Sequence, residues 1–231
     1  MLDSLRSVKQ RLQKAVMPQP EPYALTTFSE RGEDRMVHAL TGFSNSGFYV
    51  DVGAYHPQHK SNTHLLYTLG WSGINIEPTP SREKAFLDLR PRDITLNMGV
   101  SEKPSSIPFY LFDEPAFNTF SKEAMEVLSK RDYPTFLKEV AVPVRPLAQI
   151  FDEHLNGRTI DLMDVDVEGF EIEVLRSNNW EKYRPKLILL ENGSPILIAI
   201  EREAPKYLLD LGYELLGGSC QNLIFRDTQN T

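Results

Sequence analysis

Three carboxylates stand at alternate positions near the end of one apolar run, and this pattern is among the clearest signs of a functional site in the sequence. They are Asp164, Asp166 and Glu168, within the segment IDLMDVDVEGFEIEVL. If the run is a strand that continues to Glu168, all three side chains project to the same face of a sheet. Like charges this close repel one another. A cation, an amine or sulfonium group, or a proton on one carboxylate must therefore offset the charge.

The same carboxylates also allow a structural interpretation. An acidic residue just before Gly169 and Phe170 suits the N-terminus of a helix, and Asp164 can pair with an arginine or a lysine. A third alternative is Mg²⁺, which prefers oxygen ligands, with Asp164 and Asp166 as candidate ligands. Carboxylates from this segment alone do not complete an octahedron, so the metal is the weaker alternative.

Two further motifs place a glycine or an acid directly after an apolar run. In YVDVGAY, Asp51 precedes Gly53, and a glycine lets a ligand approach the backbone closely. In GINIEP, Glu77 ends the next run, where a carboxylate accepts hydrogen bonds from ribose hydroxyls in nucleotide-binding sheets. Glu77 follows Gly53 at close to the spacing of roughly 20 residues expected for such sites. Each motif alone also fits an ordinary turn or a solvated strand end.

A polar segment follows the first of these motifs and supplies hydrogen-bonding groups suited to a sugar or a carboxylate. Its members are Tyr55, His56, His59, Ser61, Asn62, Thr63 and His64. Asn62 stands near an expected helix start, where free backbone N–H groups help to bind a carboxylate. We take Tyr55 and Asn62 as candidate cofactor contacts and His59 as a candidate substrate contact. His56 is a candidate general base or a structural hydrogen-bonding residue.

These motifs need a scaffold that brings them to one edge of a sheet. Apolar runs predict strands at 47–52, 73–77, 94–98, 159–165, 185–191, 213–216 and 223–226. Periodic segments predict helices near 30–40, 63–69, 80–90, 147–155, 170–177 and 205–211. Strands that alternate with helices indicate a mostly parallel sheet covered on both faces. The last two strands are close enough to form a hairpin, which requires antiparallel pairing.

Residues 101–146 break this alternation and predict an insertion. Strand-like runs at 107–112 and 140–145 flank a polar helix at 121–128 that Ser121 can cap. We expect a hairpin or an edge extension over the site. Asn118 and Thr119 are then either substrate contacts that reach over the pocket or part of a loop that leads into the helix.

The first 22 residues differ in character from the rest of the chain. MLDSLRSVKQRLQKAVM is basic and amphipathic, and PQPEP after it is a stiff break. We expect an N-terminal helix and a proline-rich linker at 1–22, followed by one domain at 23–231. The helix packs on the domain or on a partner, or contacts a membrane surface weakly.

Composition excludes several classes of protein. The chain has 231 residues and a formal net charge of −7, so its overall field does not steer it to nucleic acid. Its single cysteine excludes an internal disulfide and a multi-cysteine metal site. No apolar run approaches the ~20 residues of a transmembrane helix. We expect a cytoplasmic protein that acts on a small molecule or a glycan, and self-association remains open.

Taken together, several blocks resemble the FkbM family of S-adenosylmethionine-dependent methyltransferases. In chain order they are YVDVGAYHP, SNTHLLYTLGWSGINIEP, NMGVSE, NTFS and IDLMDVDVEGFEIEVLRSNNWEKYRPKLILLE. The resemblance spans roughly Phe28 to Glu191, and its most specific part is DVEG followed by E-x-x-V-L. SERGED, at 29–34, is similar to an S-Q-x-G-E-D block but has Glu30 in place of the usual glutamine.

The resemblance implies an α/β fold of the Rossmann-like, class I methyltransferase type: a seven-stranded, mostly parallel sheet with an antiparallel end strand and helices on both faces. It implies S-adenosylmethionine as the cofactor. The contacts that it implies are Asp51, Gly53 and Ala54 at the methionine end, Glu77 at the ribose, and Asn97 near the adenine or its ribose. Asp166 and Glu168 then face the transferred methyl group and the acceptor.

The expected function is transfer of a methyl group to a hydroxyl of a sugar, as a nucleotide-sugar or a glycan. Such transfer needs in-line positioning and removal of the hydroxyl proton, with His56 or Asp166 as the base. One alternative is an O-methyltransferase for a polyketide or another natural product. Another is a non-catalytic, cofactor-binding scaffold in a glycan-assembly complex. A different enzyme on the same fold, a nucleotide-sugar or NAD-dependent enzyme, is disfavoured because the first turn lacks a full G-x-G-x-x-G.

Overall fold

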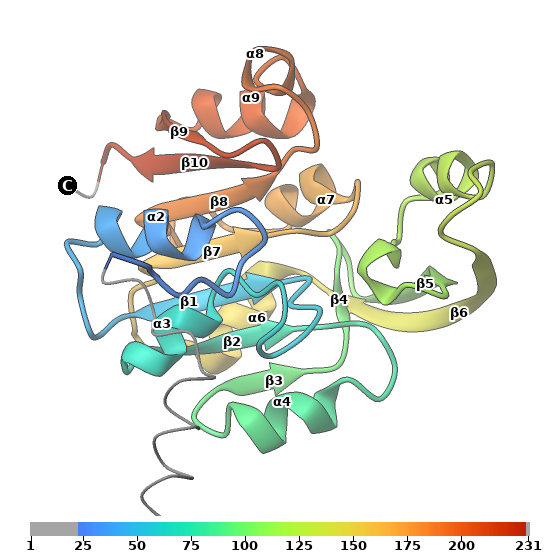
Figure 1. Cartoon of the computed structure of the whole chain (residues 1–231), viewed down its shortest axis with the longest axis horizontal. Helices are drawn as coiled ribbons and strands as arrows, with labels where there is room; N and C mark the ends of the chain where they lie inside the picture. The colour runs from blue at the N-terminus through green and yellow to red at the C-terminus, as the bar shows by residue number, and fades with distance from the viewer. Residues whose placement is uncertain (1–22, 230–231) are drawn as a thin grey trace, which may run out of the picture.

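The computed structural model describes residues 23–229, so the expected N-terminal helix and linker at 1–22 lie outside the described residues. Seven strands form the main sheet, in the order β3-β2-β1-β7-β8-β10-β9 (Figure 1). Their bounds are β1 Phe48–Val52, β2 Ser72–Ile76, β3 Ile94–Leu96, β7 Leu162–Val165, β8 Leu187–Glu191, β9 Tyr213–Gly218 and β10 Asn222–Asp227.

The pairing confirms the expected mostly parallel sheet with antiparallel pairing at one end. β1 lies between β2 and β7 and is parallel to both. β10 is antiparallel to both of its neighbours, β8 and β9. The antiparallel strand is thus the last but one, and β9 forms the edge. A short connection between β9 and β10 allows no other pairing, because parallel neighbours need a long crossover.

Helices cover both faces of this sheet (Figure 1). Their bounds are α2 Glu33–Leu40, α3 His64–Leu69, α4 Glu83–Leu89, α6 Leu147–His154, α7 Glu171–Arg176, α8 Ile196–Ala199 and α9 Glu203–Asp210. α2 and α3 pack on the face that includes Tyr49 and Leu162. α6, α7, α8 and α9 pack on the opposite face, which includes Val50 and Met163. Every residue of β1 is buried, as expected for a central strand covered on both sides.

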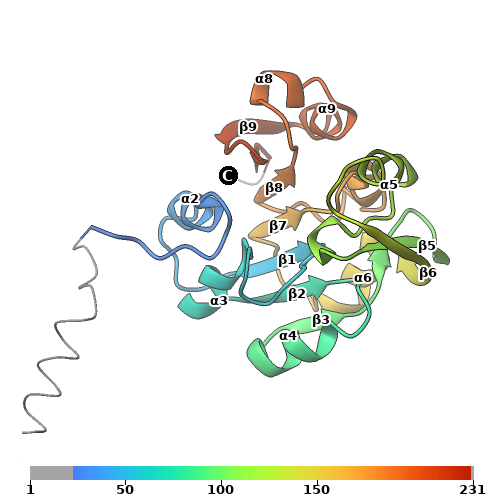
Figure 2. The same cartoon turned by 45° about the vertical axis from the view of Figure 1, so that its right-hand side comes forward.

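The insertion forms a separate three-stranded sheet in the order β4-β6-β5, beside the main sheet (Figure 2). Its elements are β4 Gly99–Val100, β5 Ser105–Phe112, the 3₁₀ helix η1 Pro115–Phe117, α5 Lys122–Leu128 and β6 Phe136–Arg145. The Ser121 hydroxyl accepts a hydrogen bond from the backbone N–H of Ala124 at 3.1 Å, which is the predicted cap. A small apolar cluster of Tyr110, Phe112 and Leu128 stabilises the insertion from within.

Several element boundaries differ from those predicted. β7 ends at Val165, so the carboxylates beyond it leave the strand and are not in line with Asp164. α2 begins at Glu33, three residues later than predicted, and its N-cap is Gly32. The Ser29 hydroxyl nevertheless accepts the backbone N–H of Gly32 at 3.1 Å. The short helix α8 and the two-residue strand β4 were not predicted. No helix in the described part of the chain is long and apolar enough to cross a lipid bilayer.

Candidate active site

A cavity opens at the carboxyl ends of β1, β2, β7 and β8, where ligands bind in open α/β sheets. It encloses about 1260 Å³ of empty space, its open mouth included. Residues from the insertion, among them Phe109, Phe117 and Asn118, close one side of it.

Gly53 joins two of the predicted motifs at the floor of the cavity. Its φ is +86°, and a Cβ placed there would lie 1.8 Å from the backbone oxygen of Asp166. The backbone N–H of Asp166 in turn donates to the oxygen of Val52 at 3.0 Å. Only glycine allows this approach. The turn after β1 and the segment after β7 thus form one continuous wall.

Glu77 is buried and held in a fixed orientation at the end of β2. One carboxylate oxygen accepts the backbone N–H of Tyr55 and the other accepts that of Thr79, each at 2.7 Å. Burial raises the pKa of Glu77, and these hydrogen bonds oppose the rise. Each oxygen keeps a lone pair for a hydroxyl donor such as that of a ribose. Asn97 does not line the cavity, because its amide donates to the backbone oxygens of Glu77 and Thr79 at 2.7 and 3.1 Å.

Asp51 points into the cavity from the end of β1 and receives one strong side-chain hydrogen bond. The Thr63 hydroxyl donates to its carboxylate at 2.5 Å. The same hydroxyl accepts a hydrogen bond from Arg90 Nη2 at 2.9 Å. Burial raises the pKa of Asp51, and the positive charge of Arg90 counteracts that rise. Arg90 therefore acts on Asp51 both through Thr63 and through its charge.

Arg90 is fully buried beneath this part of the site, and no pattern in the sequence points to it. Its Nε donates to Asp93 at 2.8 Å, and its Nη2 donates to the hydroxyl of Tyr49 at 2.6 Å. Tyr49 donates in turn to Asp93 at 2.5 Å. Both carboxylate oxygens of Asp93 are thereby satisfied, since the backbone N–H of Gly73 binds the second at 2.9 Å. This network ties β1 and β2 to the loop that carries Thr63.

Asp164 lies beside Asp51, because the two residues are partners in the β1–β7 ladder. One of its carboxylate oxygens accepts the amide N–H of Asn62 at 3.0 Å, and the other has no hydrogen-bond partner. Asp164 is only 2% exposed. Burial and then the charge of Asp51 raise its pKa well above the ordinary value. Asn62, which was predicted to bind a ligand carboxylate, thus orients an acidic side chain that lines the same cavity.

Three other carboxylates meet across the cavity from Glu77. Asp166, Glu168 and Glu191 each offer an oxygen, and these oxygens all lie within 4.8 Å of one another. Burial raises the pKa of Asp166 to about 6. Burial and repulsion by Asp166 raise the pKa of Glu168 to about 8. The same two causes raise the pKa of Glu191 well above its usual range, and Glu191 hydrogen-bonds Asp166. The cluster thus holds protons at neutral pH.

The backbone of Glu168 explains how this cluster forms. Its φ is +54°, a left-handed conformation that is uncommon outside glycine. The Thr119 hydroxyl donates to the backbone oxygen of Glu168 at 2.8 Å, and the backbone N–H of Glu168 donates to the carboxylate of Glu191 at 3.1 Å. Thr119 itself does not line the cavity. Glu191 ends the apolar run PKLILLE, so the rule that identified Glu77 was sufficient to identify it.

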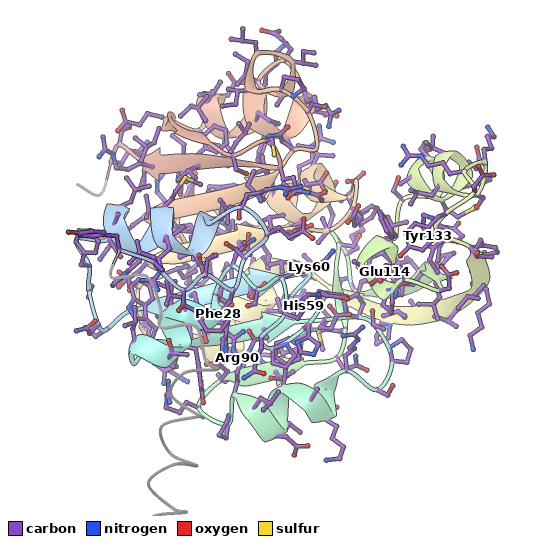
Figure 3. The ribbon with its side chains drawn as sticks, in the orientation of Figure 1. Phe28, His59, Lys60, Arg90, Glu114 and Tyr133 are labelled. Atoms are coloured by element: carbon purple, nitrogen blue, oxygen red, sulfur yellow. The ribbon has the colours of Figure 1, made fainter. Side chains whose placement is uncertain are left out.

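The insertion contacts both sides of the cavity. Asn118 accepts the backbone N–H of Phe112 at 2.8 Å, and its amide donates to the Thr79 hydroxyl at 3.1 Å, beside Glu77. The hydroxyl of Tyr55, after β1, donates to Glu114 at 3.1 Å. Figure 3 shows Glu114 in the insertion and Lys60 in the loop after β1, on the side of the sheet that faces the insertion.

The two histidines predicted for the site do not line the cavity. The Nδ1 of His56 accepts the backbone N–H groups of Gln58 and His59 at 3.1 and 3.0 Å, which shapes the loop. Burial lowers the pKa of His56. His59 is exposed. Lys60, the next residue, does line the cavity and forms an ion pair of 2.5 Å with Glu30.

The sheet order and the cavity at its carboxyl edge define a Rossmann-like α/β protein of the class I methyltransferase type. Residues 51–215 match the family model described as the methyltransferase FkbM domain. This stretch is most of the chain, and the protein belongs to the FkbM methyltransferase family. No protein of curated function matches the chain in sequence.

Solved structures of similar architecture share little sequence with this chain. A methyltransferase from Geobacter sulfurreducens is 12% identical, with 96% of each chain covered and a TM-score of 0.43. A TehB-like SAM-dependent methyltransferase from Corynebacterium glutamicum is 11% identical, with 98% of this chain and 97% of that chain covered and a TM-score of 0.41. An O-methyltransferase from Bacillus cereus in complex with SAH is 10% identical, with 97% and 98% covered and a TM-score of 0.41. Values this low assign no activity to this chain.

Proposed function

We propose that this protein is an S-adenosylmethionine-dependent O-methyltransferase whose acceptor is a hydroxyl of a sugar. One observation carries the proposal. A buried carboxylate fixed by two backbone N–H groups, Glu77, lies across a single cavity from the carboxylates Asp166, Glu168 and Glu191. The first suits a ribose and the others suit removal of a proton.

The residues present fit the cofactor. Glu77 is oriented to accept the ribose hydroxyls, and two apolar side chains that line the same cavity, Met98 and Phe117, suit an adenine ring. Gly53 leaves the close approach to the backbone that a Cβ would fill. Asp51 and the unpartnered oxygen of Asp164 suit the ammonium of the methionine end. When bound, the cofactor supplies a sulfonium-activated methyl group.

Asp166 is the residue that we propose as the base. It lines the cavity, whereas His56 does not. Its pKa of about 6 leaves it ionised at neutral pH, with a proton held by Glu191 beside it. A positioned base with a pKa near the working pH contributes roughly 10²–10⁴-fold to a reaction that removes a hydroxyl proton. Glu168, with its higher pKa, is placed to hydrogen-bond the acceptor. This acid cluster makes a non-catalytic scaffold the weaker alternative.

Calorimetric titration with S-adenosylmethionine, S-adenosylhomocysteine and NAD tests the proposal. We expect micromolar binding of both adenosyl ligands and none of NAD. Glu77→Ala should weaken adenosyl binding by about tenfold or more, because a hydrogen bond to a charged group is worth ~1.5–3 kcal/mol. Asp166→Asn should keep that binding and lose methyl transfer. Unchanged affinity in Glu77→Ala removes the ribose role, and near-native turnover in Asp166→Asn removes the base.

A further inference from the structure

The cavity is strongly acidic. Among the described residues that line it, one side chain is basic, Lys60, and its charge is already paired with Glu30 at 2.5 Å. Eight lining side chains are carboxylic: Glu30, Glu33, Asp51, Glu77, Asp164, Asp166, Glu168 and Glu191. A cavity lined by one sign of charge concentrates ligands of the opposite sign. Glu168 and Glu191 hold protons at neutral pH, but Glu30, Glu33 and Asp166 are ionised, because the pKa values of the first two are lowered and that of Asp166 is about 6. The field therefore favours a cationic or neutral acceptor and opposes a diphosphate.

The unpaired polar atoms of the cavity are all hydrogen-bond acceptors. Among the described lining residues, the buried side-chain atoms without a partner are one oxygen of Asp164 and the amide oxygen of Asn222. Asn222 is 5% exposed and lies opposite Glu191 in the β8–β10 ladder. Its amide nitrogen donates to Glu33 at 3.4 Å, which fixes which end of the amide is the oxygen. A ligand must bring N–H or O–H donors to satisfy these atoms.

Building on the proposed function, we propose that the methyl acceptor carries a protonated primary amine beside its hydroxyl, as an amino sugar does. The amine binds at the side of the cavity formed by Glu191, Glu168 and Asn222. An ammonium offers three donors and no acceptor. It can take the place of the protons that Glu168 and Glu191 hold, which pass to solvent, and it can donate to the amide oxygen of Asn222 as well. A nucleotide-sugar would instead bring a diphosphate into a cavity whose one basic side chain, Lys60, is already paired with Glu30, and a charge without a partner is costly to bury.

A divalent cation is the competing occupant. Mg²⁺ demands near-octahedral oxygens at about 2.0–2.1 Å and gives up its waters reluctantly. In this cluster the oxygens are held by hydrogen bonds: Glu191 bonds Asp166, and the Glu168 N–H donates to Glu191 at 3.1 Å. A ligand with N–H groups can donate hydrogen bonds to the same oxygens in place of these. The amine is therefore favoured over the metal.

The test uses the full-length protein saturated with S-adenosylhomocysteine, in buffer that contains EDTA. Glucosamine, glucose and UDP-glucose are titrated in parallel. We expect glucosamine to bind about tenfold tighter than glucose, the size of one charge-assisted hydrogen bond, and UDP-glucose to bind no tighter than glucose. Raising the salt concentration should weaken glucosamine alone, because its advantage is electrostatic.

Matched variants place the amine. Glu191→Gln keeps the shape of the side chain and should remove most of the tenfold preference for glucosamine. Glu168→Gln, on a different segment, should reduce it as well. Glu126→Gln makes the same change of charge on the exposed side of α5, away from the cavity, and should leave the preference intact. The S-adenosylhomocysteine affinity of each variant reports whether its cofactor site is folded.

The outcomes separate the two proposals. Failure of S-adenosylhomocysteine to bind the wild-type protein overturns the proposed function itself. If it binds, then undetectable glucosamine binding or equal affinities for glucosamine and glucose overturn the amine proposal alone. So do tighter binding of UDP-glucose, a preference that survives Glu191→Gln and Glu168→Gln, and a preference that needs added Mg²⁺.

Discussion

Replacing Gly53 by alanine tests whether the close approach of two strand ends builds the site. Gly53 has φ +86°, and a Cβ there would lie 1.8 Å from the Asp166 oxygen. The left-handed backbone alone costs alanine roughly 1–2 kcal/mol. The obstacle is backbone, so β1 and the segment after β7 must move apart, and overpacking typically adds ~1–3 kcal/mol. We expect a total loss of about 2–5 kcal/mol in the free energy of unfolding, which lowers Tm by roughly 10 °C.

Gly157→Ala is the matched control. Gly157 has φ +78°, and nothing lies within 4 Å of a Cβ placed on it. It should lose about 1 kcal/mol, from backbone strain alone. Urea denaturation gives both free energies, and titration with S-adenosylhomocysteine shows whether Gly53→Ala also loses affinity. Equal destabilisation of the two variants, or full affinity in Gly53→Ala, would refute the reasoning.

Two further predictions concern buried charge. Arg90→Met leaves the buried carboxylate of Asp93 without its one cationic partner and should destabilise the protein by ~3–5 kcal/mol. Lys84→Met breaks an exposed ion pair and should change the free energy of unfolding by less than about 1 kcal/mol in urea denaturation. Similar losses in the two variants would contradict a stabilising role of the Arg90 network. Folding raises the pKa of Glu168 from 4.5 to about 8. Between these two pH values the native state therefore binds more protons than the unfolded state. The contribution of Glu168 to stability is thus fully present at low pH and is lost as the pH rises toward 8. Glu168→Gln should remove up to ~1.4 kcal/mol per pH unit of this decline, and identical pH profiles of Tm for the two proteins would exclude it.

The architecture could be predicted because its central strands are unmistakable. β1 and β8 are buried along almost their whole length, and each appears in the sequence as an apolar run with a single acidic residue, Asp51 or Glu191. The weaker elements lack such a signal. α8 has only four residues, ILIA, whose pattern fits a strand as well as a helix. β4 has two residues, and its pairing with β6 is a tertiary contact that no local pattern announces.

The candidate site was predictable where a residue ends a strand. Glu77 and Asp166 follow from that rule, and Glu191 follows from it too but was missed. Arg90 could not be found this way, because its partners Tyr49 and Thr63 are distant in the chain. The predicted line of three carboxylates was wrong for a local reason: β7 ends at Val165. The left-handed backbone of Glu168 then turns that residue toward Glu191, which no spacing rule foresees. The sugar, the cytoplasmic location and self-association stay predictions.

The order of the strands gives the insertion a special place. The chain lays down β1, β2 and β3 outward in one direction, then returns to place β7 on the other side of β1. The insertion lies on this return path, which passes the mouth of the cavity because the sheet changes direction there. The connection begins at β3 and ends at α6, and both of these elements are packed in the main domain whatever the sequence between them. Changes in length or sequence between residues 101 and 146 can therefore reshape the acceptor side of the cavity while the strand order stays the same.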